Sequence, residues 1–92
     1  MPGPEQKIQT RIIKELRKRG AYVVKVITAS RNGVPDLLVC YEGRFIGIEV
    51  KTEAGIASAV QTANLAWIIE AGGDALVARS WEDVEIILNK VL

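Results

Sequence analysis

Two apolar segments, residues 36–41 and 44–51, are separated only by the dipeptide Glu42-Gly43. A two-residue connection containing glycine is typical of a tight β-hairpin, because its backbone twist matches the twist of the flanking strands. The dipeptide therefore predicts two antiparallel strands in which Tyr41 pairs with Arg44. Counting back along that register places Asp36 opposite Glu49.

Helix signals lie on both sides of the hairpin. The first helix is expected from Pro4 to about Arg19, the second from Ser58 to about Ala71, and the third begins with the capping signature at residues 80–83. Strands are expected at residues 22–28 and 75–79. The apolar sides of the first and third helices consist of Ile8, Ile12, Ile13 and Leu16, and of Val84, Ile87, Leu88 and Val91.

The elements follow one another in the order α-β-β-β-α-β-α. An antiparallel meander followed by a helical crossover into a further strand favours an α/β fold with a mixed sheet flanked by helices. We expect a single domain over residues 1–92, and a domain this small would gain stability as a dimer. The sequence has neither a signal-peptide pattern nor an apolar run near the roughly 20 residues that span a bilayer, so no membrane partner is expected.

Histidine is absent, and Cys40 is the single cysteine. This composition excludes a disulfide framework, the usual zinc sites and any nucleophile activated by histidine. Carboxylates, lysine and hard cations remain as candidates for chemistry. Residues 1–51 carry a net charge of +5 and residues 52–92 a net charge of −4. Such a split fits a phosphate-facing surface, and it also fits a chance distribution of solvated charges.

Glu49 and Lys51 form the triplet Glu-Val-Lys on the second hairpin strand. Because side chains alternate along a strand, they share one face, while Val50 points to the other. Asp36 would lie across from Glu49, with the two β-carbons about 5 Å apart. Two such carboxylates repel unless Lys51 or a cation offsets them, and hard oxygen ligands suit Mg²⁺ or Mn²⁺. The alternative is an ordinary salt-bridge ladder on a solvated sheet face.

Two helix-start residues add to this pattern. Glu5 lies in line with the buried stripe of the first helix, as either a helix-dipole partner or a ligand reaching over the sheet. Gln61 heads the apolar side of the second helix, where a polar group needs a partner. It could reach Lys51, or it could be a plain helix-start residue.

Several further positions are candidates for contacts with DNA. Lys7 and Arg11 belong to a basic face of the first helix, which is either a phosphate-binding surface or a solvated one. Ser30, Arg31 and Asn32 precede Asp36 and could touch a phosphate, although turn residues need no such role. The loop around Gly55 is expected to be a mobile substrate loop.

Together, the motifs Glu5, Gly33-Val34-Pro35-Asp36, Glu49-Val50-Lys51 and Gln61 resemble the VRR-NUC family. That family is a branch of the PD-(D/E)xK nucleases, with a restriction-endonuclease-like core, and its minimal stand-alone members occur in phages and bacteria. The similarity extends to archaeal Holliday-junction resolvases and runs from Glu5 to the strand at Ala75. One departure is Gln6, because the archaeal resolvases have arginine directly after the helix glutamate.

The resemblance implies a metal-dependent DNA endonuclease that hydrolyses phosphodiester bonds in the cytoplasm of a bacterial or phage-infected cell. It implies that Asp36, Glu49 and the Val50 carbonyl bind Mg²⁺ or Mn²⁺, with Glu5 as an outer or second-metal ligand. Lys51 and Gln61 would orient the attacking water. The expected substrate is branched DNA such as a four-way junction, cut by a homodimer. Two alternatives stay open, namely a non-catalytic nucleic-acid-binding module of the same fold and a flap or RNA nuclease.

Overall fold

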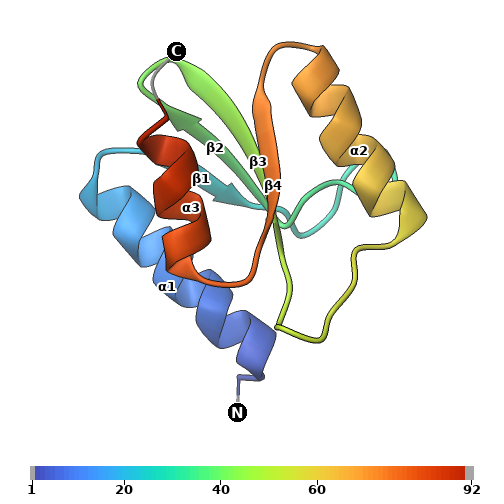
Figure 1. The fold of residues 1–92 in the computed structure, drawn as a ribbon, viewed down its shortest axis with the longest axis horizontal. Helices are drawn as coiled ribbons and strands as arrows, with labels where there is room; N and C mark the ends of the chain where they lie inside the picture. The colour runs from blue at the N-terminus through green and yellow to red at the C-terminus, as the bar shows by residue number, and fades with distance from the viewer. Residues whose placement is uncertain (1, 91–92) are drawn as a thin grey trace.

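A computed structural model describes residues 2–90 of the chain. The strands form one four-stranded sheet in the order β1-β2-β3-β4, with antiparallel β1–β2 and β2–β3 pairs and a parallel β3–β4 pair. The expected α-β-β-β-α-β-α order and the mixed sheet are confirmed (Figure 1). The elements are α1 (Pro4–Lys18), β1 (Tyr22–Lys25), β2 (Leu37–Tyr41), β3 (Arg44–Val50), α2 (Ala59–Glu70), β4 (Asp74–Ala78) and α3 (Trp81–Leu88).

The hairpin between β2 and β3 has the expected two-residue turn. Glu42 and Gly43 both have positive φ, 48° and 77°, as a type I′ turn requires. Tyr41 pairs with Arg44, and the register continues to the pair Leu37–Ile48. The next residues outward in this register are Asp36 and Glu49.

The first strand is shorter than expected and ends at Lys25 instead of Thr28. Its last partner is Leu37, the first residue of β2. One more backbone hydrogen bond joins the Val26 N–H to the Asp36 carbonyl at 2.9 Å, and beyond it the chain leaves the sheet. The segment from Ile27 to Thr28 therefore has the residue types of a strand but no strand to pair with.

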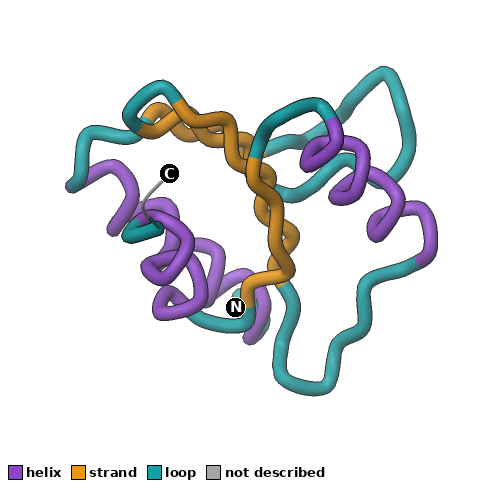
Figure 2. Tube along the Cα trace, turned by 45° about the horizontal axis from the view of Figure 1, so that its top comes forward, coloured by secondary structure: helices purple, strands orange, loops and turns teal. Residues whose placement is uncertain are grey.

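Helices α1 and α3 cover one face of the sheet, and α2 covers part of the other (Figures 1 and 2). None of these helices, within residues 2–90, is long and apolar enough to cross a membrane. Val91, expected on the inner side of α3, lies outside the described residues. The core between the sheet and the α1–α3 layer includes Ile12, Leu16, Val39, Ile46, Ile48, Val50, Trp81, Val84 and Leu88.

Helix α2 packs closely on β3 because β3 has a glycine at the contact. A Cβ atom at Gly47 would lie 2.6 Å from Ile68 Cδ1 and 3.1 Å from Pro35 Cγ. The face of β3 that carries Glu49 is thus covered, and Glu49 is only 2% exposed. The alternative of a solvated salt-bridge ladder is therefore wrong, because Glu49 is buried beneath α2.

Gly33, in the loop before β2, is a second point of close approach to α2. It has φ +79°, and a Cβ atom there would lie 2.8 Å from both the carbonyl carbon and the oxygen of Val60. Gly20, after α1, has nearly the same φ, +81°, but open space around the Cβ position. Alanine at Gly20 would therefore cost only the strain of a positive φ, whereas alanine at Gly33 would cost that strain and a steric clash.

We predict that Gly20→Ala lowers the free energy of unfolding by about 1–2 kcal/mol, the cost of a left-handed backbone for an L-residue. Gly33→Ala should lower it by about 2–4 kcal/mol, because the methyl group also pushes the loop away from α2. Urea unfolding of the two variants in parallel measures the difference. Equal losses would mean that the loop and α2 do not pack as closely as the structure shows.

Candidate active site at the carboxyl end of β3

Four of the expected site residues meet beside the end of β3. Glu49 Oε2 lies 3.3 Å from Lys51 Nζ and accepts a hydrogen bond of 3.1 Å from Gln61 Nε2. Asp36 Oδ2 accepts a hydrogen bond of 2.8 Å from the Val50 N–H. The cross-strand register therefore places the two carboxyl groups together, and α2 adds the glutamine.

Gln61 acts both as a helix-start residue and as a site residue. Its N–H donates to Ser58 Oγ at 3.2 Å, and its Oε1 accepts from the Ser58 N–H at 2.9 Å, which completes a capping box. With its oxygen held in this way, the amide turns its Nε2 toward Glu49. The partner of Gln61 is thus Glu49 and not Lys51, the partner expected from the sequence.

Glu49 has an unusual environment for a carboxylate. Its Oε1 atom is buried and has no hydrogen-bond partner among the described residues. Burial, followed by the negative charge of Asp36, raises the pKa of Glu49 to about 7, although the hydrogen bond and charge of Lys51 act in the opposite direction. A buried acceptor without a partner is costly, and a cation would relieve that cost.

The oxygen donors at this position fit a hard divalent cation. Two carboxylates lie together. Within residues 2–90, no three His, Cys, Asp or Glu side chains lie close enough to one another to hold a metal ion by themselves. Mg²⁺ is commonly held by one or two carboxylates and completes its octahedron with carbonyls, waters and substrate oxygens. The carboxylates of Asp36 and Glu49 are therefore chemically suited to such an ion.

Glu5 does not lie on a buried stripe, and this expectation is wrong. Along that side of α1, Leu16 and Ile12 are buried, Ile8 is half-buried and Glu5 is exposed. Burial thus decreases toward the start of the helix. The first turn of α1 lies at the same end of the molecule as the carboxyl end of β3 (Figure 1), but Glu5 is outside the hydrogen-bonded group around Glu49.

The loop before Asp36 is tied to α2 by a residue that sequence reasoning missed. Asn64 is only 4% exposed, and its Nδ2 donates to the Asn32 carbonyl at 3.0 Å and to the Val60 carbonyl at 2.8 Å. Asn64 could have been found from the sequence, because it lies three residues after Gln61 and therefore on the same side of the helix. Ser30, earlier in the same loop, is exposed.

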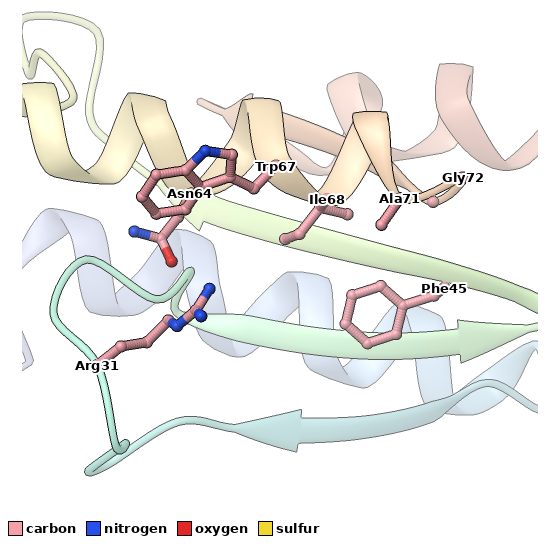
Figure 3. Close-up of a pocket in the computed structure, with 8 residues that line it drawn as sticks. Arg31, Phe45, Asn64, Trp67, Ile68, Ala71 and Gly72 are labelled. Carbon is pink, nitrogen blue, oxygen red and sulfur yellow. The ribbon is translucent and has the colours of Figure 1, made fainter.

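Arg31, the remaining expected DNA contact of this loop, lies 5.6 Å from the centroid of the Trp67 ring. Both residues line a groove of about 510 Å³ between α2 and the sheet. Figure 3 shows Asn64, Trp67 and Ile68 of α2 on one side of this groove, facing Arg31 and Phe45. Phe45 also lines a second hollow of about 320 Å³ over β1 and β2, with Tyr22, Val24, Leu38, Val39 and Cys40. The two hollows join into one surface, which we call the α2–β1 face.

The expected basic residues of α1 are exposed. Lys7 and Arg11 line a small pocket of about 230 Å³ together with Arg79, Ser80 and Trp81, the first residue of α3. Arg11 also lies 3.4 Å from Glu82, but both side chains are about 60% exposed, so this ion pair adds little stability. Arg79 is the second residue that sequence reasoning missed, and it contacts the loop around Gly55.

The fold and the carboxylate pair together define an α/β protein with a candidate hard-cation site at the end of a β-hairpin. Comparison of the sequence with protein-family models and with curated proteins gave no match. Comparison with solved structures shows that the fold is that of VRR_NUC domain proteins and of an archaeal resolvase. The expected resemblance to these proteins is confirmed at the level of the fold.

Three solved structures illustrate this likeness. A structure described as a VRR_NUC domain matches with a TM-score of 0.82 and 24% identity, over 99% of this chain and 100% of that chain. A VRR_NUC domain protein matches with a TM-score of 0.74 and 19% identity, over 91% and 84% of the two chains. The Holliday junction resolvase Hjc from Archaeoglobus fulgidus matches with a TM-score of 0.60 and 24% identity, over 78% and 64%.

The raised pKa of Glu49 predicts how stability depends on pH in the presence of a chelator. A carboxyl whose pKa rises from 4.5 to about 7 on folding stabilises the fold below pH 4.5, and this contribution is lost as the pH rises to about 7. The loss should be on the order of 2–3 kcal/mol. Glu49→Gln should remove this part of the pH dependence, as measured by urea unfolding at pH 5 and pH 8. An identical pH dependence in Glu49→Gln and the unsubstituted protein would contradict the assignment.

Proposed function

We propose that this chain is a metal-dependent endonuclease that hydrolyses phosphodiester bonds in DNA. The observation that supports the proposal most is the buried Oε1 atom of Glu49, which has no hydrogen-bond partner within the described residues although Asp36 and Lys51 are adjacent. A non-catalytic binding module would have no use for paired carboxylates where DNA phosphates approach. A hydrolase that uses a divalent cation requires them.

In the proposed mechanism, Asp36, Glu49 and the Val50 carbonyl would hold Mg²⁺ or Mn²⁺. Such an ion would supply a water of lowered pKa and positive charge beside the phosphate. Gln61 donates to Oε2 of Glu49, and Oε1, which has no hydrogen-bond partner among the described residues, would be the oxygen available to the ion. Lys51 orients the attacking water or stabilises the negative charge that develops on the phosphoryl oxygens. Glu5, on the first turn of α1, remains a proposed outer or second-metal ligand.

The proposed substrate is branched DNA. The likeness to a protein described as a Holliday junction resolvase supports a four-way junction. Lys7 and Arg11 are exposed at the end of the molecule that carries the site, where they would contact phosphates. Ser30, Arg31 and Asn32 would contact DNA from the loop before Asp36.

We further propose that the protein acts as a homodimer and that the second copy covers the α2–β1 face. Tyr22 is 71% exposed, Phe45 45% and Trp67 51%, and all three belong to this face. A contiguous apolar surface of this kind is typical of a protein interface. A twofold dimer would also supply two sites to a substrate with two equivalent strands.

We predict that Asp36→Asn abolishes both Mn²⁺ binding and cleavage while the fold remains intact. Asparagine can still accept the hydrogen bond from the Val50 N–H, but it lacks the charge that a hard cation needs. Calorimetric Mn²⁺ titration and a cleavage panel of junction, flap, nicked duplex, single strand and RNA measure both effects. Glu70→Gln, an exposed position at the end of α2, is the control that removes the same charge. Full cleavage in excess chelator would exclude the metal mechanism.

We predict that the protein sediments as a dimer at micromolar concentration, twice its chain mass of 10.1 kDa. A charge in the α2–β1 face should prevent this association, so Phe45→Glu should sediment as a folded monomer. Ile86→Glu, on an exposed part of α3, is the matched control and should remain a dimer. A monomer that stays monomeric on a four-way junction would remove the dimeric resolvase from the proposal and leave the nuclease.

A further inference from the structure

We infer that Arg79 is a positioning residue for Lys51, and that it acts through the loop that follows β3. This inference rests on the proposed function, because it assigns a role within the same site. Arg79 directly follows β4, the parallel neighbour of β3. The Lys51 N–H still donates to the Ala78 carbonyl at 3.0 Å, so the two chain segments stay joined one residue beyond the paired strands.

The guanidinium of Arg79 organises this loop through its backbone. Its Nη1 atom donates to three loop carbonyls, those of Thr52, Glu53 (3.3 Å) and Gly55 (2.7 Å). The Gly55 N–H closes the turn by donating to the Thr52 carbonyl at 3.0 Å. A rigid guanidinium is suited to holding several acceptors in one geometry. Hydrogen bonds to one side chain therefore join three carbonyls of this loop.

The loop in turn confines Lys51. A Cβ atom at Gly55 would lie 3.3 Å from Lys51 Cβ and 3.4 Å from Lys51 Cδ, so the Gly55 backbone rests against the aliphatic part of the lysine. The Lys51 side chain is only 15% exposed, and its Nζ lies 3.3 Å from Glu49 Oε2. A free lysine side chain has many rotamers, and this packing removes most of them before any substrate arrives.

Arg79 is itself anchored to the opposite layer of the molecule. Its N–H donates to Asp83 Oδ2 at 2.9 Å, in the first turn of α3. The Asp83 N–H donates to Oγ of Ser80, the N-cap residue, at 3.4 Å. The position of Lys51 is thus linked through Arg79 to α3, on the far side of the sheet from Gln61.

A second role for Arg79 would be a direct phosphate contact, since it lines a pocket with Lys7 and Arg11. The two roles differ in what they require. A phosphate contact requires mainly the positive charge, which lysine also provides. Positioning of the loop requires that Nη1 reach the loop carbonyls from a planar guanidinium of fixed orientation, whereas the lysine ammonium is one bond closer to the backbone and rotates freely.

The test compares Arg79→Ala and Arg79→Lys with Arg17→Ala, an exposed arginine of α1 whose loss removes the same charge. The first readout does not depend on cleavage and consists of hydrogen exchange in residues 52–57 and the acetylation rate of Lys51. We expect both Arg79 variants to increase both quantities by about threefold or more, because the loop opens locally. Arg17→Ala should leave them unchanged.

The second readout is the single-turnover cleavage rate at saturating DNA, with Lys51→Ala as the lower reference. Both Arg79 variants should be slower by about tenfold with nearly unchanged affinity, because the loss concerns orientation in the transition state. If Arg79→Ala does not fold, Arg79→Lys carries the same comparison, since it keeps the charge and most of the aliphatic part of the side chain.

Unchanged exchange and unchanged Lys51 labelling in the Arg79 variants would overturn the inference. So would a normal cleavage rate in Arg79→Lys combined with lost DNA affinity in Arg79→Ala, because that result identifies a phosphate contact. If the unsubstituted protein cuts no DNA, the proposed function fails. The exchange and labelling results then still decide whether Arg79 holds Lys51 in place.

Discussion

The contact between α2 and β3 at Gly47 is the constraint on which the site depends. With no side chain at that position, Ile68 and Pro35 approach the strand, and the helix closes over Glu49. The same contact that completes the second layer of the fold therefore removes a carboxylate from water next to another carboxylate. This arrangement disfavours the ionised form, and the pKa of Glu49 rises accordingly. The packing thus makes a nearby positive charge favourable, and the charge of Lys51 offsets the rise in the pKa of Glu49 only in part.

The pairing of Asp36 with Glu49 could be predicted from the sequence because a two-residue turn leaves the register no freedom. The positive φ values of Glu42 and Gly43 confirm that turn, and every cross-strand pair follows from it. The burial of Glu49 could not be predicted in the same way. Alternation along a strand says which side chains share a face, but it does not say whether a helix covers that face. That depends on where the crossover carries α2.

The position of Glu5 shows the corresponding limit of helical periodicity. The spacing gives the direction of a side chain around the helix axis, but not how far along the axis the sheet extends, so a residue in line with Ile12 can still be exposed. Asn64 and Arg79 were missed for a different reason. Their partners are backbone carbonyls. Every residue has a backbone carbonyl, so the residue types of a loop do not indicate which carbonyl accepts a side-chain hydrogen bond.

The site is held from both sides of the sheet. Gln61 fixes one oxygen of Glu49 from the α2 side, whereas Arg79 fixes the loop over Lys51 from the α3 side. The 3.3 Å separation of Glu49 and Lys51 therefore depends on the relative position of two layers on opposite faces of the sheet (Figure 2). Because β3 is the strand buried between these layers, a shift of either helix would act on the geometry of the site through that one strand. A short chain can hold a charged pair in a fixed arrangement in this way, since the sheet supplies rigidity that a single loop would lack.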